Sequence, residues 1–81
     1  MTIPDLKRVK IAAEAELQTW LAKHPHYDAP VMVLTVADRR STRHVTRDRI
    51  AAVAADHRRL IGPRYTLNGG LVGTVIEPPR A

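Results

Sequence analysis

Apolar side chains recur at three- and four-residue steps through the first quarter of the chain. This spacing is that of one apolar face of a helix. Thr2 and Asp5 resemble a capping box at its start, and Pro25 disfavours helix beyond His24. The pattern therefore predicts a helix over residues 2–24. Its apolar stripe consists of Leu6, Val9, Ala13, Leu17, Trp20 and Leu21.

Ile11, Ala15 and Ala22 fall on the opposite side of this predicted helix. Together they form a small second apolar strip. A chain of this size adds stability mainly through helix packing or self-association, because its own core is small. The strip therefore suggests a homodimer in which two copies of the helix pack together.

The segment VMVLTVA, residues 31–37, is apolar at both alternating sets of positions. A strand with this pattern is covered on both faces, so we predict the central strand of a sheet. The following DRRS, residues 38–41, has the composition of a turn. TRHVT, residues 42–46, is then predicted to pair back as a short, charged edge strand.

A second helix is predicted to follow Thr46. Thr46 is a favourable N-cap, and Asp48 in the first turn is favoured by the helix dipole. Gly62 and Pro63 are predicted to stop the helix after residue 61. Its buried stripe comprises Ile50, Val53, Ala54, His57, Leu60 and Ile61.

The last segment, residues 64–79, contains Asn68-Gly69 between two apolar-rich runs. This dipeptide is the strongest short signal for two strands joined by a type I′ turn. Pro78 and Pro79 are then expected to end the second of these strands.

These elements give the order α-β-β-α-β-β. No linker or repeat divides the chain, so we predict one compact α+β domain over residues 1–81, with an antiparallel sheet packed by two helices. The alternative is a winged-helix-like fold, with residues 47–61 as the recognition helix and 64–76 as the wing. Against it, a strand stands where the preceding helix should be, and the hairpin tip carries no basic residue.

The amino-acid composition limits the kinds of site that the protein can have and the cellular compartment in which we expect it. The 81 residues include no cysteine, which excludes disulfides and thiolate metal sites. The longest apolar run, residues 29–37, is too short to span a bilayer, and residues 1–10 lack the apolar region of a secretory signal. We therefore expect a cytoplasmic protein without a membrane role.

The charge favours an acidic partner, because the chain carries a net charge of +5. Guanidinium groups donate two hydrogen bonds at once to phosphate, and a helix N-terminus also attracts anions. The candidate binding residues are therefore arginines. Five surround the predicted turn and the start of the second helix, and three more extend the patch: Arg39, Arg40, Arg43, Arg47 and Arg49, then Arg58, Arg59 and Arg64.

The leading hypothesis is a small binding module that contacts the nucleic-acid backbone. Trp20, Tyr27 and Tyr65 are the only aromatic residues, which disfavours stacking on single-stranded bases and leaves duplex backbone contacts. The alternative is an inhibitory or accessory module that docks on an acidic surface of a larger partner protein. In a third interpretation, Asp38 and Asp48 neutralise part of the cluster and the remaining arginines are only solvated.

Catalysis, cofactors and metals have no support in the sequence. The acidic residues are scattered, and the hairpin glycines lack the following Lys-Ser/Thr of a phosphate-binding loop. His24 and His26 lack the further ligands that a metal site needs. His57, within an apolar stripe, is expected to be buried and neutral with one hydrogen-bond partner. We therefore predict a protein that is not an enzyme.

Overall fold

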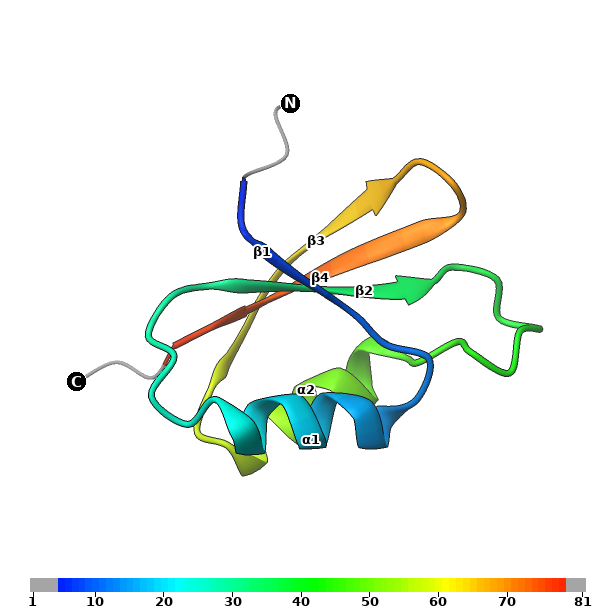
Figure 1. The fold of residues 1–81 in the computed structure, drawn as a ribbon. Helices are drawn as coiled ribbons and strands as arrows, with labels where there is room; N and C mark the ends of the chain where they lie inside the picture. The colour runs from blue at the N-terminus through cyan, green and yellow to red at the C-terminus, as the bar shows by residue number, and fades with distance from the viewer. Residues whose placement is uncertain (1–4, 79–81) are drawn as a thin grey trace.

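The computed structural model describes residues 5–78, which form a four-stranded sheet and two helices (Figure 1). The elements are β1 (Lys7–Lys10), α1 (Glu14–Lys23), β2 (Val31–Val36), α2 (Arg47–Asp56), β3 (Leu60–Leu67) and β4 (Leu71–Glu77). The predicted α+β class, with a sheet packed by two helices, is confirmed. The described chain begins with a strand, so the observed order is β-α-β-α-β-β.

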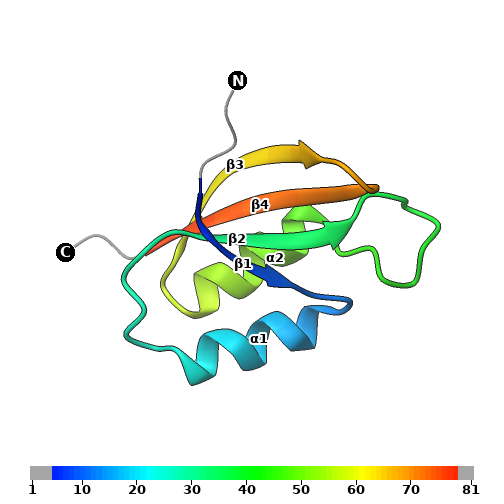
Figure 2. The same ribbon diagram turned by 45° about the horizontal axis from the view of Figure 1, so that its top comes forward.

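The sheet is mixed, whereas an antiparallel sheet was predicted. The strands lie in the order β1-β2-β4-β3. β1 runs parallel to β2, while β4 is antiparallel to both of its neighbours. The parallel pair needs a crossover connection, which α1 provides. Figure 2 shows both helices on one side of the sheet, here called the helix face; the other side is the open face.

The segment predicted as one long helix divides into β1 and α1. Val9 and Ile11 face the core and Lys10 between them is exposed, which is the alternation of a strand. Ile11 is only 3% exposed, and its N–H donates to the Leu34 carbonyl at 3.0 Å. The dimer hypothesis placed Ile11 on an exposed helical strip, and that placement is wrong. The predicted cap at Thr2 lies outside the described residues.

β2 forms the centre of the core, as predicted. Val33 and Met32 point to opposite faces of the sheet, and both are 0% exposed. On the open face, Met32 lies over Gly73, where a Cβ atom would come within 2.6 Å of the Met32 sulfur. On the helix face, Val33 joins one apolar cluster with Ile11, Leu17, Leu21, Val45, Ile50, Val53, Ala54 and Ile76.

α2 begins where it was predicted to begin. Thr46 is the N-cap, and its hydroxyl accepts a hydrogen bond from the Arg49 N–H at 3.3 Å. The predicted edge strand over residues 42–46 is wrong, because residues 37–46 form a loop between β2 and α2. This loop is central to the candidate site described below.

α2 ends earlier than predicted, at Asp56. Arg58 adopts a left-handed backbone conformation with φ +58°. The N–H groups of Arg58 and Arg59 then donate to the carbonyls of Ala55 and Ala54 at 3.0 and 2.7 Å. This pair of bonds is the Schellman motif, in which glycine is the usual left-handed residue. An arginine therefore ends the helix in the place where glycine is preferred.

β3 and β4 form the predicted hairpin, in which Leu67 pairs with Leu71. The turn consists of residues 68–70, with positive φ at Gly69 (79°) and Gly70 (72°). The left-handed conformations thus fall one residue later than in the predicted type I′ turn at Asn68-Gly69.

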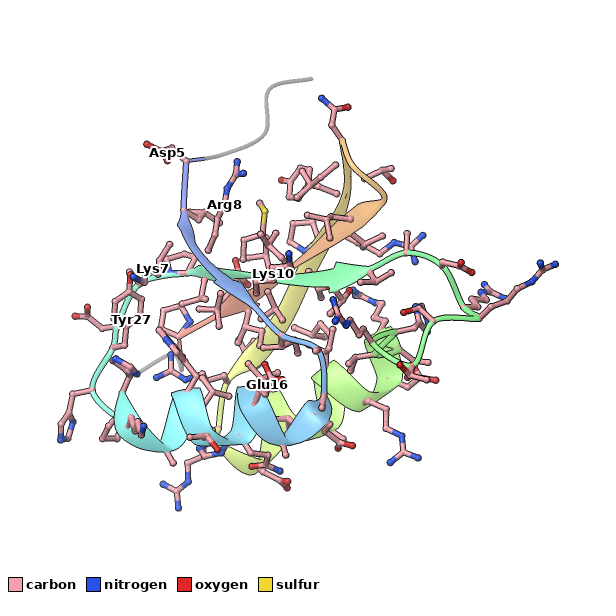
Figure 3. All side chains as sticks on the ribbon, turned by 45° about the vertical axis from the view of Figure 1, so that its right-hand side comes forward. Asp5, Lys7, Arg8, Lys10, Glu16 and Tyr27 are labelled. Atoms are coloured by element: carbon pink, nitrogen blue, oxygen red, sulfur yellow. The ribbon has the colours of Figure 1, made fainter. Side chains whose placement is uncertain are left out.

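Both edges of the sheet are unfavourable for further strand pairing. β1 has the sequence KRVK, and Arg8 points away from the helices (Figure 3). At the other edge, the pairing of β3 with β4 is irregular between Ile61 and Arg64. Gly62 and Pro63, predicted to stop α2, occupy this irregularity. Charges, bulges and proline are common protections of an edge strand.

Replacing Arg58 by glycine is expected to stabilise the fold, because glycine has no Cβ to strain at a left-handed φ. We expect the free energy of unfolding, measured by urea denaturation, to rise by about 1 kcal/mol relative to Arg58→Ala. The alanine variant removes the same side chain and keeps the Cβ, so it is the matched control. Equal stability of the two variants would contradict backbone strain at this residue.

Candidate anion-binding groove

The loop of residues 37–46 projects beyond the end of β2 (Figure 1). Two hydrogen bonds fix its position. The Ala37 N–H donates to the Gly70 carbonyl at 2.8 Å, and the His44 Nδ1 lies 2.8 Å from the Val36 carbonyl oxygen. The first bond joins the loop to the hairpin turn, and the second returns it to the end of β2. Loop, hairpin turn and the start of α2 therefore lie at one end of the molecule.

Short polar side chains organise the backbone inside this loop. The Asp38 Oδ1 accepts a hydrogen bond from the Arg40 N–H at 3.0 Å. The Ser41 Oγ accepts one from the Arg43 N–H at 3.1 Å. Such local bonds are typical of Asp and Ser in turns. These bonds use the backbone N–H groups of Arg40 and Arg43 and not their guanidinium groups. Both residues are exposed.

A groove of about 670 Å³ opens beside the loop, on the helix face of the sheet. Its lining comes from β2, β3 and β4, here called the floor, and from the loop and the first turn of α2, here called the walls. A volume of this size lies within the range of about 300–1,000 Å³ that is usual for small-ligand sites. Its lining is rich in arginine and threonine.

Three arginines from three separate segments line this groove: Arg39 from the loop, Arg47 from α2 and Arg64 from β3. The Arg47 Nη1 donates to the Gly62 carbonyl at 3.1 Å, which orients its guanidinium toward β3. Asp48 is the only carboxylate among the described residues that line the groove. The lining therefore carries an excess of two positive charges, with His44 counted as neutral.

Threonine hydroxyls line the floor. Thr35 and Thr74 are 3% and 1% exposed, and the Thr35 hydroxyl donates to the Val72 carbonyl at 3.5 Å. The Thr74 hydroxyl has no hydrogen-bond partner within residues 5–78. In the same range, no side-chain oxygen that is sealed from solvent lacks a partner. The Thr74 oxygen is therefore not fully sealed from solvent, and Thr74 is one of the residues that line the groove.

The first turn of α2 adds backbone donors to the wall. The N–H groups of Arg49 and Ile50 are bonded to the side chain and the carbonyl of Thr46. The N–H groups of Arg47 and Asp48 have no partner in the described part of the chain. Unpaired N–H groups and the helix dipole give this end of α2 a partial positive charge.

Arg40, Arg43 and Arg49 do not line the groove. Arg40 and Arg43 are on the exposed part of the loop. The Arg49 Nη1 lies 3.4 Å from the Glu14 Oε2, and the Arg49 side chain is 69% exposed. An ion pair with that exposure contributes little to stability. Six of the eight predicted arginines thus gather at the loop end of the molecule.

Arg58 and Arg59 lie at the opposite end of α2. Arg58 is exposed, whereas Arg59 is only 5% exposed. The Arg59 Nη1 and Nη2 donate to the carbonyls of Tyr27 and His24 at 2.8 and 3.0 Å. Its guanidinium ties the segment after α1 to the start of β3. Because that group is used inside the fold, Arg59 is not part of the candidate surface.

His24, His44 and His57 each have a hydrogen-bond partner. His57 is half-buried, and its Nε2 lies 3.0 Å from the Gln18 Oε1. His44, which lines the groove, was not singled out from the sequence, nor were the floor threonines. Thr35 and Thr74 each stand at an alternate position of a predicted strand. Because alternate side chains of a strand point to the same face, this position is the sequence signal that could have placed both hydroxyls on one side of the sheet.

Within residues 5–78, no group of three or more side chains is arranged to hold a metal ion. That part of the chain also contains no helix of the length and apolarity needed to cross a bilayer. Comparison of the chain with protein-family models, curated proteins and solved structures gives no match. The proposed function therefore rests on the geometry of the groove.

Replacing Arg59 by methionine is expected to lower the free energy of unfolding by about 2 kcal/mol, because two backbone carbonyls lose their donors. Urea denaturation measures this change. Arg58→Met is the matched control, since it removes an exposed charge at the neighbouring position. A loss of stability no greater than in that control would contradict a structural role for the Arg59 guanidinium.

Proposed function

We propose that this protein is a non-enzymatic module that binds the nucleic-acid backbone through the groove beside residues 37–46. The observation that carries the proposal is the convergence of Arg39, Arg47 and Arg64 on one groove at the start of α2. These residues come from a loop, a helix and a strand. Their grouping is therefore a property of the fold and not only of an arginine-rich sequence.

The chemistry of the groove suits phosphate. Guanidinium groups donate two parallel hydrogen bonds to phosphate oxygens. The free N–H groups at the start of α2 and the threonine hydroxyls are the other donors that commonly contact phosphates in nucleic-acid complexes. Arg40 and Arg43, exposed on the adjacent loop, are placed to reach phosphates outside the groove.

The distribution of apolar residues favours nucleic acid over an acidic protein surface. Stable protein interfaces have a core of large apolar or aromatic side chains. Among the described residues, Leu60 is the only exposed large hydrophobic side chain, with 43% of its surface accessible. It pairs with Glu77 at the start of β3, whereas the groove lies near Thr66 and Val72. Within residues 5–78, the groove is therefore lined by no exposed large hydrophobic side chain that could anchor a protein partner.

The expected result is salt-dependent binding to random-sequence duplex DNA. If Arg39, Arg40, Arg43, Arg47 and Arg64 each contact a phosphate, log affinity falls with log salt at a slope of about −4.5. Changing Arg39, Arg47 and Arg64 to alanine together removes three contacts and should bring the slope to about −1.8. Fluorescence anisotropy across a salt titration measures both slopes.

Arg58→Ala is the control for this experiment, because Arg58 is exposed and lies away from the groove. It should leave the slope almost unchanged, and thermal denaturation should show that the triple variant is folded. Absence of binding at low salt, or equal slopes for the triple variant and the control, would contradict the proposal. Capture of an acidic protein through the same arginines would then support the alternative partner class.

A further inference from the structure

We propose that the groove takes the terminal phosphate of a nucleic-acid strand, a phosphomonoester, in preference to phosphodiesters within the strand. This inference rests on the proposed function, to which it adds the part of the nucleic acid that enters the groove. The observation behind it is Thr74, a residue of the groove floor that is 1% exposed and whose hydroxyl has no hydrogen-bond partner within residues 5–78.

The walls around the groove floor favour the end of a nucleic-acid strand over its interior. The loop and the first turn of α2 form walls around the strands that carry Thr35 and Thr74. The outer surface of a duplex is convex, so phosphates within its strands contact the rim of such a groove. A terminal phosphate has chain on one side only. It therefore reaches the floor while the rest of the strand stays outside.

The charge of the lining matches a dianion. Arg39, Arg47 and Arg64 together with Asp48 leave an excess of two positive charges. A terminal phosphate carries about −1.5 to −2 charges at neutral pH, as other phosphomonoesters do. A phosphodiester carries a single negative charge. The terminal group therefore neutralises the lining more completely than an internal phosphate does.

The number of hydrogen-bond donors in the groove also favours a terminal phosphate. A phosphomonoester presents three strong acceptor oxygens. The groove offers the Thr74 hydroxyl of its floor, the free N–H groups of Arg47 and Asp48 on one wall, and guanidinium donors. An internal phosphate presents two free oxygens, so one set of donors would stay without an acceptor.

The test uses one duplex of fixed sequence with phosphate on its 5′ ends, on its 3′ ends, or on neither. We expect the wild-type protein to bind one phosphorylated form about tenfold more tightly than the form with hydroxyl ends, as for a hydrogen-bonded charged group. Circular duplex DNA, which has no ends, should compete poorly for the phosphorylated form. Fluorescence anisotropy at one salt concentration measures each affinity.

Thr74→Val then tests the floor, because valine keeps the shape of threonine and removes the hydroxyl. It should abolish most of the preference for phosphorylated ends, measured as the ratio of the affinities for the phosphorylated and the hydroxyl-ended duplex. Thr19→Val is the matched control, since the Thr19 hydroxyl bonds to the Ala15 carbonyl at 3.0 Å on exposed α1. Its preference for phosphorylated ends should equal that of the wild type.

Equal affinity of the wild type for phosphorylated and hydroxyl ends would overturn this inference and leave the proposed function standing. Absence of binding to every form would overturn both. Inorganic phosphate that displaces the phosphorylated duplex at the concentration of the duplex itself would also overturn the inference, because the groove would then select a free ion. A preference that survives unchanged in Thr74→Val would overturn the inference as well, because the Thr74 hydroxyl would then not hold the terminal phosphate.

Discussion

The burial of β2 on both faces is the constraint on which the rest of this structure depends. Met32 and Val33 have no exposed surface, so β2 needs a neighbour on each side and a covering layer. Its parallel neighbour β1 requires α1 as a crossover. The chain that leaves β2 at Val36 must then return to the helix layer before α2 can complete the core. The loop of residues 37–46 makes this return at the end of the sheet, and it thereby brings its arginines to the start of α2.

The elements that the sequence predicts correctly have strong local signals. β2 is apolar at every position but one, Thr46 is a favourable cap, and Asn68-Gly69 marks the hairpin. The prediction of a helix at residues 7–10 was wrong because Val9 fits both the helical stripe and the two-residue alternation with Ile11. Over four residues these two periods are hard to separate. The end of α2 was mistaken because an arginine takes the backbone conformation that glycine normally supplies.

The residue types of the candidate site could be predicted from the sequence, but not which of these residues lie together in space. Arg39 and Arg47 are near each other in sequence, whereas Arg64 joins them only through the pairing of β3 with β4. Arg58 and Arg59 are adjacent, yet one is exposed and the other is buried against backbone carbonyls. Thr74 lines the same groove as the loop and the first turn of α2, which are distant from it in the sequence. No local pattern encodes such tertiary properties.

The two protected edges of the sheet decide how this protein can assemble with copies of itself. A strand that approached β1 would meet the closely spaced charges of KRVK. One that approached β3 would meet an irregular stretch at Gly62 and a proline without an N–H at residue 63. Growth of a continuous sheet across molecules is therefore disfavoured at both described edges. Self-assembly through the faces of the sheet or the helices would not need backbone pairing between molecules, so the protection of the edges does not act on it.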